Sequence, residues 1–166
     1  MFQLKSLTRE GIAPALRKVD RYRLLNEPWR AESICRDVLE IDPENQEALI
    51  ALLLSLTDQF RERGTAAAQN ARALVARIAG EYQQAYFSGI ICEREGTAIL
   101  GRDSYGTGPV AYHWLSEAMR WYEKAEAVRP AGDDDAILRW NACARLIAMN
   151  PHVRAVEEQA QEIQLE

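Results

Sequence analysis

The chain reads AESICRDVLEIDPEN over residues 31–45 and EAMRWYEKAEAVRP over residues 117–130. In both stretches a small residue is followed four positions later by a larger one, and three positions after that by another apolar residue. A proline comes five positions further on. The matching residues are Ala31, Cys35, Val38 and Pro43 in the first stretch, and Ala118, Tyr122, Ala125 and Pro130 in the second. Spacings of four and three keep side chains on one helical face, and proline stops a helix. The two stretches therefore predict two helices of the same design.

Both stretches resemble the second helix of a tetratricopeptide repeat (TPR), in which an alanine lets the two helices of a hairpin approach closely. The string YEKA at residues 122–125, followed by Pro130, is especially characteristic of that family. The resemblance covers about residues 12–150, although no first helix carries the family's fuller Trp, Leu-Gly and Tyr pattern. It implies an all-α fold: a right-handed superhelical solenoid of about four antiparallel helix pairs.

Apolar periodicity and turn signals place these helix pairs along the chain. The predicted first helices are 12–25, 46–59, 82–95 and 133–146, and the predicted second helices are 28–41, 65–79, 109–128 and 151–164. Gly89 stands where the family often uses glycine for close helix contact, and Gly96 matches its hairpin-turn glycine.

The predicted organisation has three parts. Residues 1–11 form an N-terminal segment, residues 12–150 form the hairpins, and residues 151–166 form a C-terminal capping helix that ends the exposed core. Residues 99–110 are rich in glycine and are predicted as a loop insertion in the third hairpin. Such a loop is either part of a binding face or a tolerated surface loop.

Composition is that of a soluble globular protein, with 48% hydrophobic and 27% charged residues among 166. The net charge of −5 makes the whole chain a poor candidate for nucleic acid or an anionic membrane. Residues 1–30, however, hold seven lysines and arginines against three acids, a net charge of +4, so the remainder carries −9. This basic first hairpin either meets an acidic partner or the acidic end of another copy, or is a solvated helix face.

The sequence predicts a cytoplasmic protein in a reducing compartment. No secretory signal is recognisable at residues 1–10, and the longest apolar run, residues 48–54, is far too short to span a membrane. Three widely spaced cysteines do not suggest a disulfide framework.

Candidate catalytic groups are sparse, so we expect no enzyme, no metal and no cofactor. His113 and His152 fall in different hairpins, and Cys35, Cys92 and Cys143 occupy isolated apolar helix positions. The glycines near residue 105 lack the strand and lysine of a phosphate-binding loop. Residues 133–135, three aspartates, suit a helix N-terminus better than a calcium loop. A third hypothesis is an enzyme that uses Tyr105, His113 or a cysteine near the loop at residues 99–110.

The TPR resemblance implies a concave wall, lined mainly by first helices, that receives a peptide or a partner helix. The implied wall positions are Leu16, Arg17 and Asp20, then Ile50, Ala51 and Leu54, then Tyr86, Phe87 and Ile90, and finally Ile137, Leu138 and Asn141. The wall is apolar in its middle. Because Leu16, Asp20 and Ala51 stand where some members carry lysines and asparagines, a carboxylate clamp is not expected.

An exposed apolar wall needs a cover. The candidates are a partner helix, a second copy, or the chain's own residues 1–8 through Phe2, Leu4 and Leu7. In a helix register shifted by one residue, the same side chains would instead pack between adjacent hairpins.

The leading functional prediction is a protein–protein interaction module, an adaptor or a non-catalytic subunit of a complex. Its predicted partner-binding residues are Ile50, Leu54, Tyr86, Phe87, Ile90 and Ile137, with polar contacts from Arg94, Asn141 and Arg145. The alternative is a self-assembling structural protein whose hairpins stack between copies.

Overall fold

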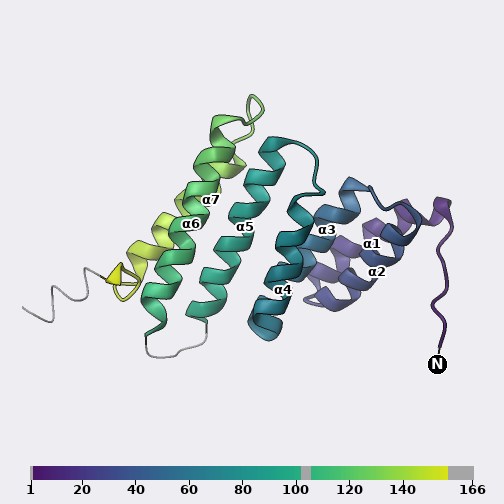
Figure 1. Ribbon diagram of the computed structural model, residues 1–166, viewed down its shortest axis with the longest axis horizontal. Helices are drawn as coiled ribbons and strands as arrows, with labels where there is room; N and C mark the ends of the chain where they lie inside the picture. The colour runs from purple at the N-terminus through teal and green to yellow at the C-terminus, as the bar shows by residue number, and fades with distance from the viewer. Residues whose placement is uncertain (1, 102–105, 157–166) are drawn as a thin grey trace, which may run out of the picture. The chain divides into compact units, whose positions relative to one another are not determined.

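The computed structural model describes residues 2–101 and 106–156, which fold into α-helices and one short 3-10 helix with no β-strand (Figure 1). The predicted all-α class is confirmed. In chain order the elements are η1 (Arg9–Gly11), α1 (Ile12–Leu24), α2 (Pro28–Ile41), α3 (Gln46–Thr57), α4 (Phe60–Val75), α5 (Glu81–Leu100), α6 (Thr107–Ala127) and α7 (Asp135–Met149).

The chain divides into two compact units between Ala79 and Gly80. In the first unit, α1 packs on α2, α2 on α3 and α3 on α4, and α1 also contacts α3. In the second unit, α5 packs on α6 and α6 on α7. Each helix therefore packs mainly against its neighbours in sequence.

The two stretches with the shared pattern are helices of the same design, as predicted. Ala31, Cys35 and Val38 are buried on α2. The matching side chains on α6, at residues 118, 122 and 125, are buried as well. The helices end at Ile41 and Ala127, shortly before the two prolines.

Local signals set the helix starts in the first unit. Pro28 opens α2 at the position where its missing N–H costs least. The side chain of Asn45 accepts a hydrogen bond from the backbone N–H of Ala48 at 2.9 Å, which caps α3. The predicted starts at Ile12, Pro28 and Gln46 are confirmed.

The fourth helix begins at Phe60 rather than at Thr65, because Phe60 is a buried core residue. Gly64, with φ 55° and ψ −134°, interrupts the helical backbone and kinks α4. The extra turn before Gly64 holds Arg63, which pairs with Glu32 of α2.

Glu32 is a buried carboxylate held by several donors. It accepts hydrogen bonds from Arg36 Nη2 at 2.7 Å, Gln59 Nε2 at 2.8 Å and Arg63 Nη1 at 2.6 Å. Burial alone would raise the pKa of Glu32. The hydrogen bonds from Arg36 and Gln59, together with the charge of Arg63, outweigh that effect and lower its pKa. The network ties α2 to the start of α4.

Two glycines on α5 allow close packing against α6. A Cβ at Gly89 would lie 2.5 Å from Cε1 of Tyr122, which confirms the expected role of Gly89 in close helix contact. The prediction that Gly96 forms a hairpin turn is wrong. Gly96 lies inside α5, where a Cβ would lie 3.0 Å from Cγ of Leu115, and the helix continues to Leu100.

The predicted loop at residues 99–110 is shorter than expected. Ile99 and Leu100 end α5, and residues 107–110 form the first turn of α6. Of the residues between these helices, Gly101 and Gly106 are described. Residues 102–105, including Tyr105, lie outside the described residues.

The predicted capping helix does not begin at Pro151. Residues 151–155 form turns and bends, with the N–H of Val153 donating to the carbonyl of Asn150 at 2.8 Å. Val153 is buried, and a Cβ at Gly108 would lie against the carbonyl oxygen of His152, so this turn packs on the start of α6. A helical residue appears at Val156, and residues 157–166 lie outside the described part of the chain.

Candidate partner-binding site

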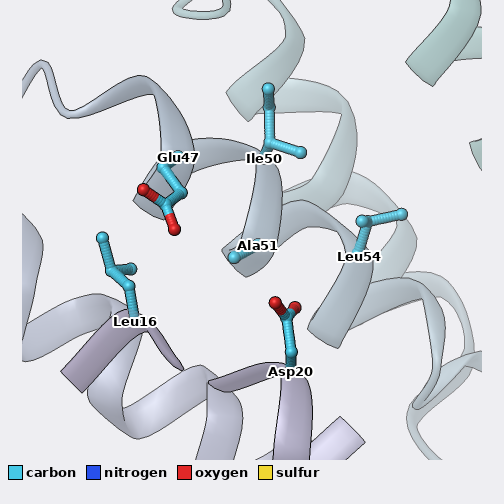
Figure 2. Close-up of a pocket in the computed structure, with 6 residues that line it drawn as sticks. All are labelled: Leu16, Asp20, Glu47, Ile50, Ala51 and Leu54. Carbon is cyan, nitrogen blue, oxygen red and sulfur yellow. The ribbon is translucent and has the colours of Figure 1, made fainter. Parts of the chain in front are cut away.

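A pocket of about 310 Å³ lies between α1 and α3 in the first unit (Figure 2). Leu16 and Asp20 line it from α1, and Glu47, Ile50, Ala51 and Leu54 line it from α3. We call this the α1–α3 pocket. Five of its six lining residues are implied wall positions, including Ile50 and Leu54 of the predicted partner-binding set.

Helical spacing explains why these residues face the same space. Leu16 and Asp20 are four positions apart on α1, so they are neighbours on one face. The lining residues of α3 are spaced by three, one and three positions, which places them on one stripe of that helix.

The third helix is apolar on almost every side. Its residues Ala48, Leu49, Leu52, Leu53 and Leu56 are buried in the first unit. Ile50, Ala51 and Leu54, which face the pocket, are only half-buried. A helix that is apolar all round is normally covered all round. This stripe of α3 is therefore an apolar surface that no described part of the first unit fully covers.

Two carboxylates stand beside this apolar stripe. Figure 2 shows the side chains of Asp20 and Glu47 directed into the space between α1 and α3. Both residues are exposed, and neither has an ion-pair partner among the residues that the structure describes. By contrast, Arg23 and Asp58 of the same unit pair at 2.8 Å. The pocket thus combines an apolar stripe with two carboxylates that form no ion pair among the described residues.

The structure places the other predicted site residues in the second unit, where several are not free to line a wall. Phe87 is 6% exposed and Ile90 is 2% exposed, so their predicted exposure on a groove is wrong. The physical reason is that α5 buries residues around most of its circumference. Tyr86 is half-buried, with ring centroids 5.8 Å from Tyr82 and 6.0 Å from Tyr122.

The remaining predicted residues are more accessible. Arg94 is half-buried on α5. Ile137, Asn141 and Arg145 follow one another at four-residue spacing along α7, so they share a face of that helix. Ile137 and Asn141 are half-buried, and Arg145 is exposed.

Glu47 was not among the predicted wall residues. A signal for it exists in the sequence, since Glu47 lies three positions before Ile50 and four before Ala51. Extending the wall stripe by one turn toward the start of α3 would have found it.

The second unit holds its own buried polar contact. Tyr122 Oη donates to Glu93 Oε2 at 2.6 Å, and Arg139 Nη1 donates to Glu93 Oε1 at 3.0 Å. Burial, followed by the charge of Glu93, raises the pKa of Tyr122. Burial alone would lower the pKa of Arg139, but attraction to Glu93 raises it overall. This contact joins α5, α6 and α7 and was not predicted.

The cysteine thiols are buried. Burial raises the pKa of Cys35 and that of Cys143 to about 12, so both thiols stay protonated near neutral pH. The described ranges contain no group of three or more His, Cys, Asp or Glu side chains placed to hold a metal ion.

Among the helices of the described residues, none has the length and apolar character needed to cross a membrane. No protein-family model matches the chain, and neither a curated protein nor a solved structure matches it.

Proposed function

We propose that this chain is a protein–protein interaction module, an adaptor or a non-catalytic subunit, that binds a segment of another protein in the α1–α3 pocket. The observation that supports this most strongly is the half-buried stripe of Ile50, Ala51 and Leu54 on a helix whose other faces are buried. Covering that stripe removes apolar surface from water, which favours association.

The volume of the pocket limits how many side chains of a partner it can hold. Its volume of about 310 Å³ is at the lower end of the roughly 300–1,000 Å³ typical of ligand pockets. It suits one or two apolar side chains of a peptide or helix. Each large buried anchor contributes about 1.5–3 kcal/mol before ordering costs are subtracted.

The carboxylates of Asp20 and Glu47 add a charge preference. A lysine or arginine next to the apolar anchor would pair with them, while an acidic segment or a free C-terminal carboxylate would be repelled. We therefore propose that the partner segment is apolar and basic.

The proposal includes a TPR-like solenoid, supported within the first unit by the contact between α1 and α3, the two predicted first helices. It also includes a non-catalytic role in the cytoplasm, which rests on the sequence alone. A self-assembling role is the second candidate, favoured by the exposed apolar side chains of Phe2 and Leu4 in the N-terminal segment.

A phage-displayed peptide library selected against the full chain tests the proposal without knowledge of the partner. We expect enriched peptides to share a large apolar residue with a lysine or arginine close by. Their affinity should fall at least tenfold for Leu54→Arg, which places a charge in the pocket. The matched control is Leu24→Arg, because Leu24 is 88% exposed on α1 and does not line the pocket.

Circular dichroism establishes that both variants keep their helicity. Two outcomes would refute the proposal: a selection that enriches no peptide, or enriched peptides that bind the Leu54→Arg variant as tightly as the original chain.

A further inference from the structure

The N-terminal segment, residues 2–7, carries large apolar side chains into solvent. Phe2 is 103% exposed and Leu4 is 91% exposed. The segment belongs to no helix or strand, and Lys5 adds an exposed positive charge. In an extended backbone, residues two apart point to the same side. Phe2 and Leu4 can therefore enter one apolar pocket together.

The segment and the α1–α3 pocket are complementary in two independent respects. Phe2 and Leu4 match the apolar stripe of Ile50 and Leu54, which is only half-buried. Lys5 matches the carboxylates beside that stripe, which lack an ion-pair partner among the described residues. Opposite charges placed beside an apolar contact favour one partner and one orientation.

The segment does not occupy the pocket of its own chain, because the side chains of residues 2–6 are exposed and none of them lines the pocket. The side chain and the carbonyl of Thr8 both accept hydrogen bonds from the N–H of Gly11, at 3.2 and 3.0 Å, and Thr8 is extended. Figure 1 shows the purple N-terminal end as a trace at the edge of the first unit, outside its helices. The exposed segment is therefore available to the pocket of a second copy.

We propose that residues 2–7 of a second copy occupy the α1–α3 pocket, so that copies of the chain associate by exchanging their N-terminal segments. Phe2 and Leu4 of one copy pack on Ile50 and Leu54 of the other. Lys5 starts on the opposite side of the extended segment, and its long side chain bends around the edge of the segment to pair with Asp20 and Glu47. This inference rests on the proposed function, because it requires a pocket that binds an apolar and basic segment. A foreign partner then competes with the second copy for the same pocket.

Complementation between two defective variants tests this arrangement. The segment variant, Phe2→Ser with Leu4→Ser, keeps its pocket, and the pocket variant, Leu54→Arg, keeps its segment. Size-exclusion chromatography with light scattering should find the original chain above its monomer mass of 18.8 kDa at tens of micromolar. Each variant alone should associate at least tenfold more weakly.

An equal mixture of the two variants should recover a complex of two chains, because one intact segment can still enter one intact pocket. Charge exchange provides a second test: Lys5→Glu should weaken association, and Asp20→Lys with Glu47→Lys should restore it in that background. Glu40→Lys is the control, since Glu40 is an exposed acid on α2 outside the pocket.

Three results would overturn the inference. The first is a monomer at every concentration. The second is a monomeric chain whose segment variant binds library-selected peptides more tightly than the original chain does. That result would mean that the segment occupies the pocket of the same chain. The third is association that persists in both variants. In each case, continued binding of selected peptides to the pocket leaves the proposed function standing, so the two failures are distinguishable.

Discussion

Gly89 of α5 faces the ring of Tyr122 on α6 so closely that a Cβ at position 89 would lie 2.5 Å from Cε1 of the tyrosine. This closeness brings the two helices together and lets Tyr122 Oη reach Glu93, one turn further along α5, at 2.6 Å. One missing side chain thus sets both the helix spacing and the polar contact of the second unit.

Gly89→Ala should therefore destabilise the chain. Alanine in place of glycine inside a helix normally stabilises by about 0.5–1 kcal/mol. Here the added methyl group forces the Tyr122 ring to move, and overpacking of this kind costs about 1–3 kcal/mol. Urea unfolding followed by circular dichroism measures the change in the free energy of unfolding. A more stable variant would show that α5 and α6 do not approach this closely.

Tyr122→Phe should remove the hydrogen bond to Glu93 and cost about 1–3 kcal/mol of stability, because the carboxylate loses a buried donor. The pKa of Tyr122 is raised in the folded state, so its contribution to stability is present below the unfolded value of about 10 and is lost as pH rises above it.

The loss of stability on raising the pH above about 10 should therefore be smaller in Tyr122→Phe than in the original chain. Tyr22→Phe, in the first unit, is the control. Identical alkaline unfolding curves for all three proteins would contradict the buried contact.

Glu32 should make the first unit sensitive to acid. Its pKa in the folded state lies below the ordinary value near 4.5. A lowered pKa means that its contribution to stability is present above the unfolded value and is lost as pH falls through the folded value.

Glu32→Gln should reduce stability by about 1–3 kcal/mol at neutral pH, since the arginines lose a charged acceptor. The difference between the original chain and the variant should shrink below about pH 4.5. Unfolding curves at several pH values measure it, with Glu40→Gln as the control for a solvent-exposed acid. A difference that stays constant, or grows, as the pH falls would contradict the network around Glu32.

Cys35 and Cys143 should react slowly with a thiol reagent in the folded chain at mildly alkaline pH. Both are buried, and burial raises the pKa of each to about 12, so little thiolate forms. Unfolding in urea should restore the rate of a free thiol. Absorbance of the released reagent measures both rates, and equal rates with and without urea would place these thiols at the surface.

Local signals were sufficient to predict α1, α2 and α3 of the first unit, but not the start of α4 at Phe60. Pro28 and the Asn45 cap mark the starts of α2 and α3, and the small-residue pattern of Ala31 and Cys35 identifies a buried face. The spacing of Ile50 and Leu54 placed them on a common stripe, and both line the pocket. Each of these inferences depends on residues within one or two helical turns.

The errors fall where packing between helices decides the outcome. The sequence alone predicts a turn at Gly96. In the structure Gly96 lies inside α5, where Leu115 of α6 packs closely against it. Phe87 and Ile90 are large and apolar, as residues of a binding wall would be, so the sequence alone does not distinguish the two cases. Their burial depends on the packing around α5. The contact of Glu93 with Tyr122 and Arg139 joins residues 29 and 46 positions apart, beyond the reach of a periodicity argument.

The measurement that most directly tests the central claim is a methyl NMR titration of the full chain with a library-selected peptide. If the α1–α3 pocket binds partners, the methyl resonances of Ile50 and Leu54 should shift and saturate. Those shifts should weaken when Asp20→Lys and Glu47→Lys are introduced, because the basic residue of the peptide loses its counter-charges. Saturable binding that moves Ile137 or Leu138 of α7 while leaving Ile50 and Leu54 unchanged would contradict the assignment of the pocket.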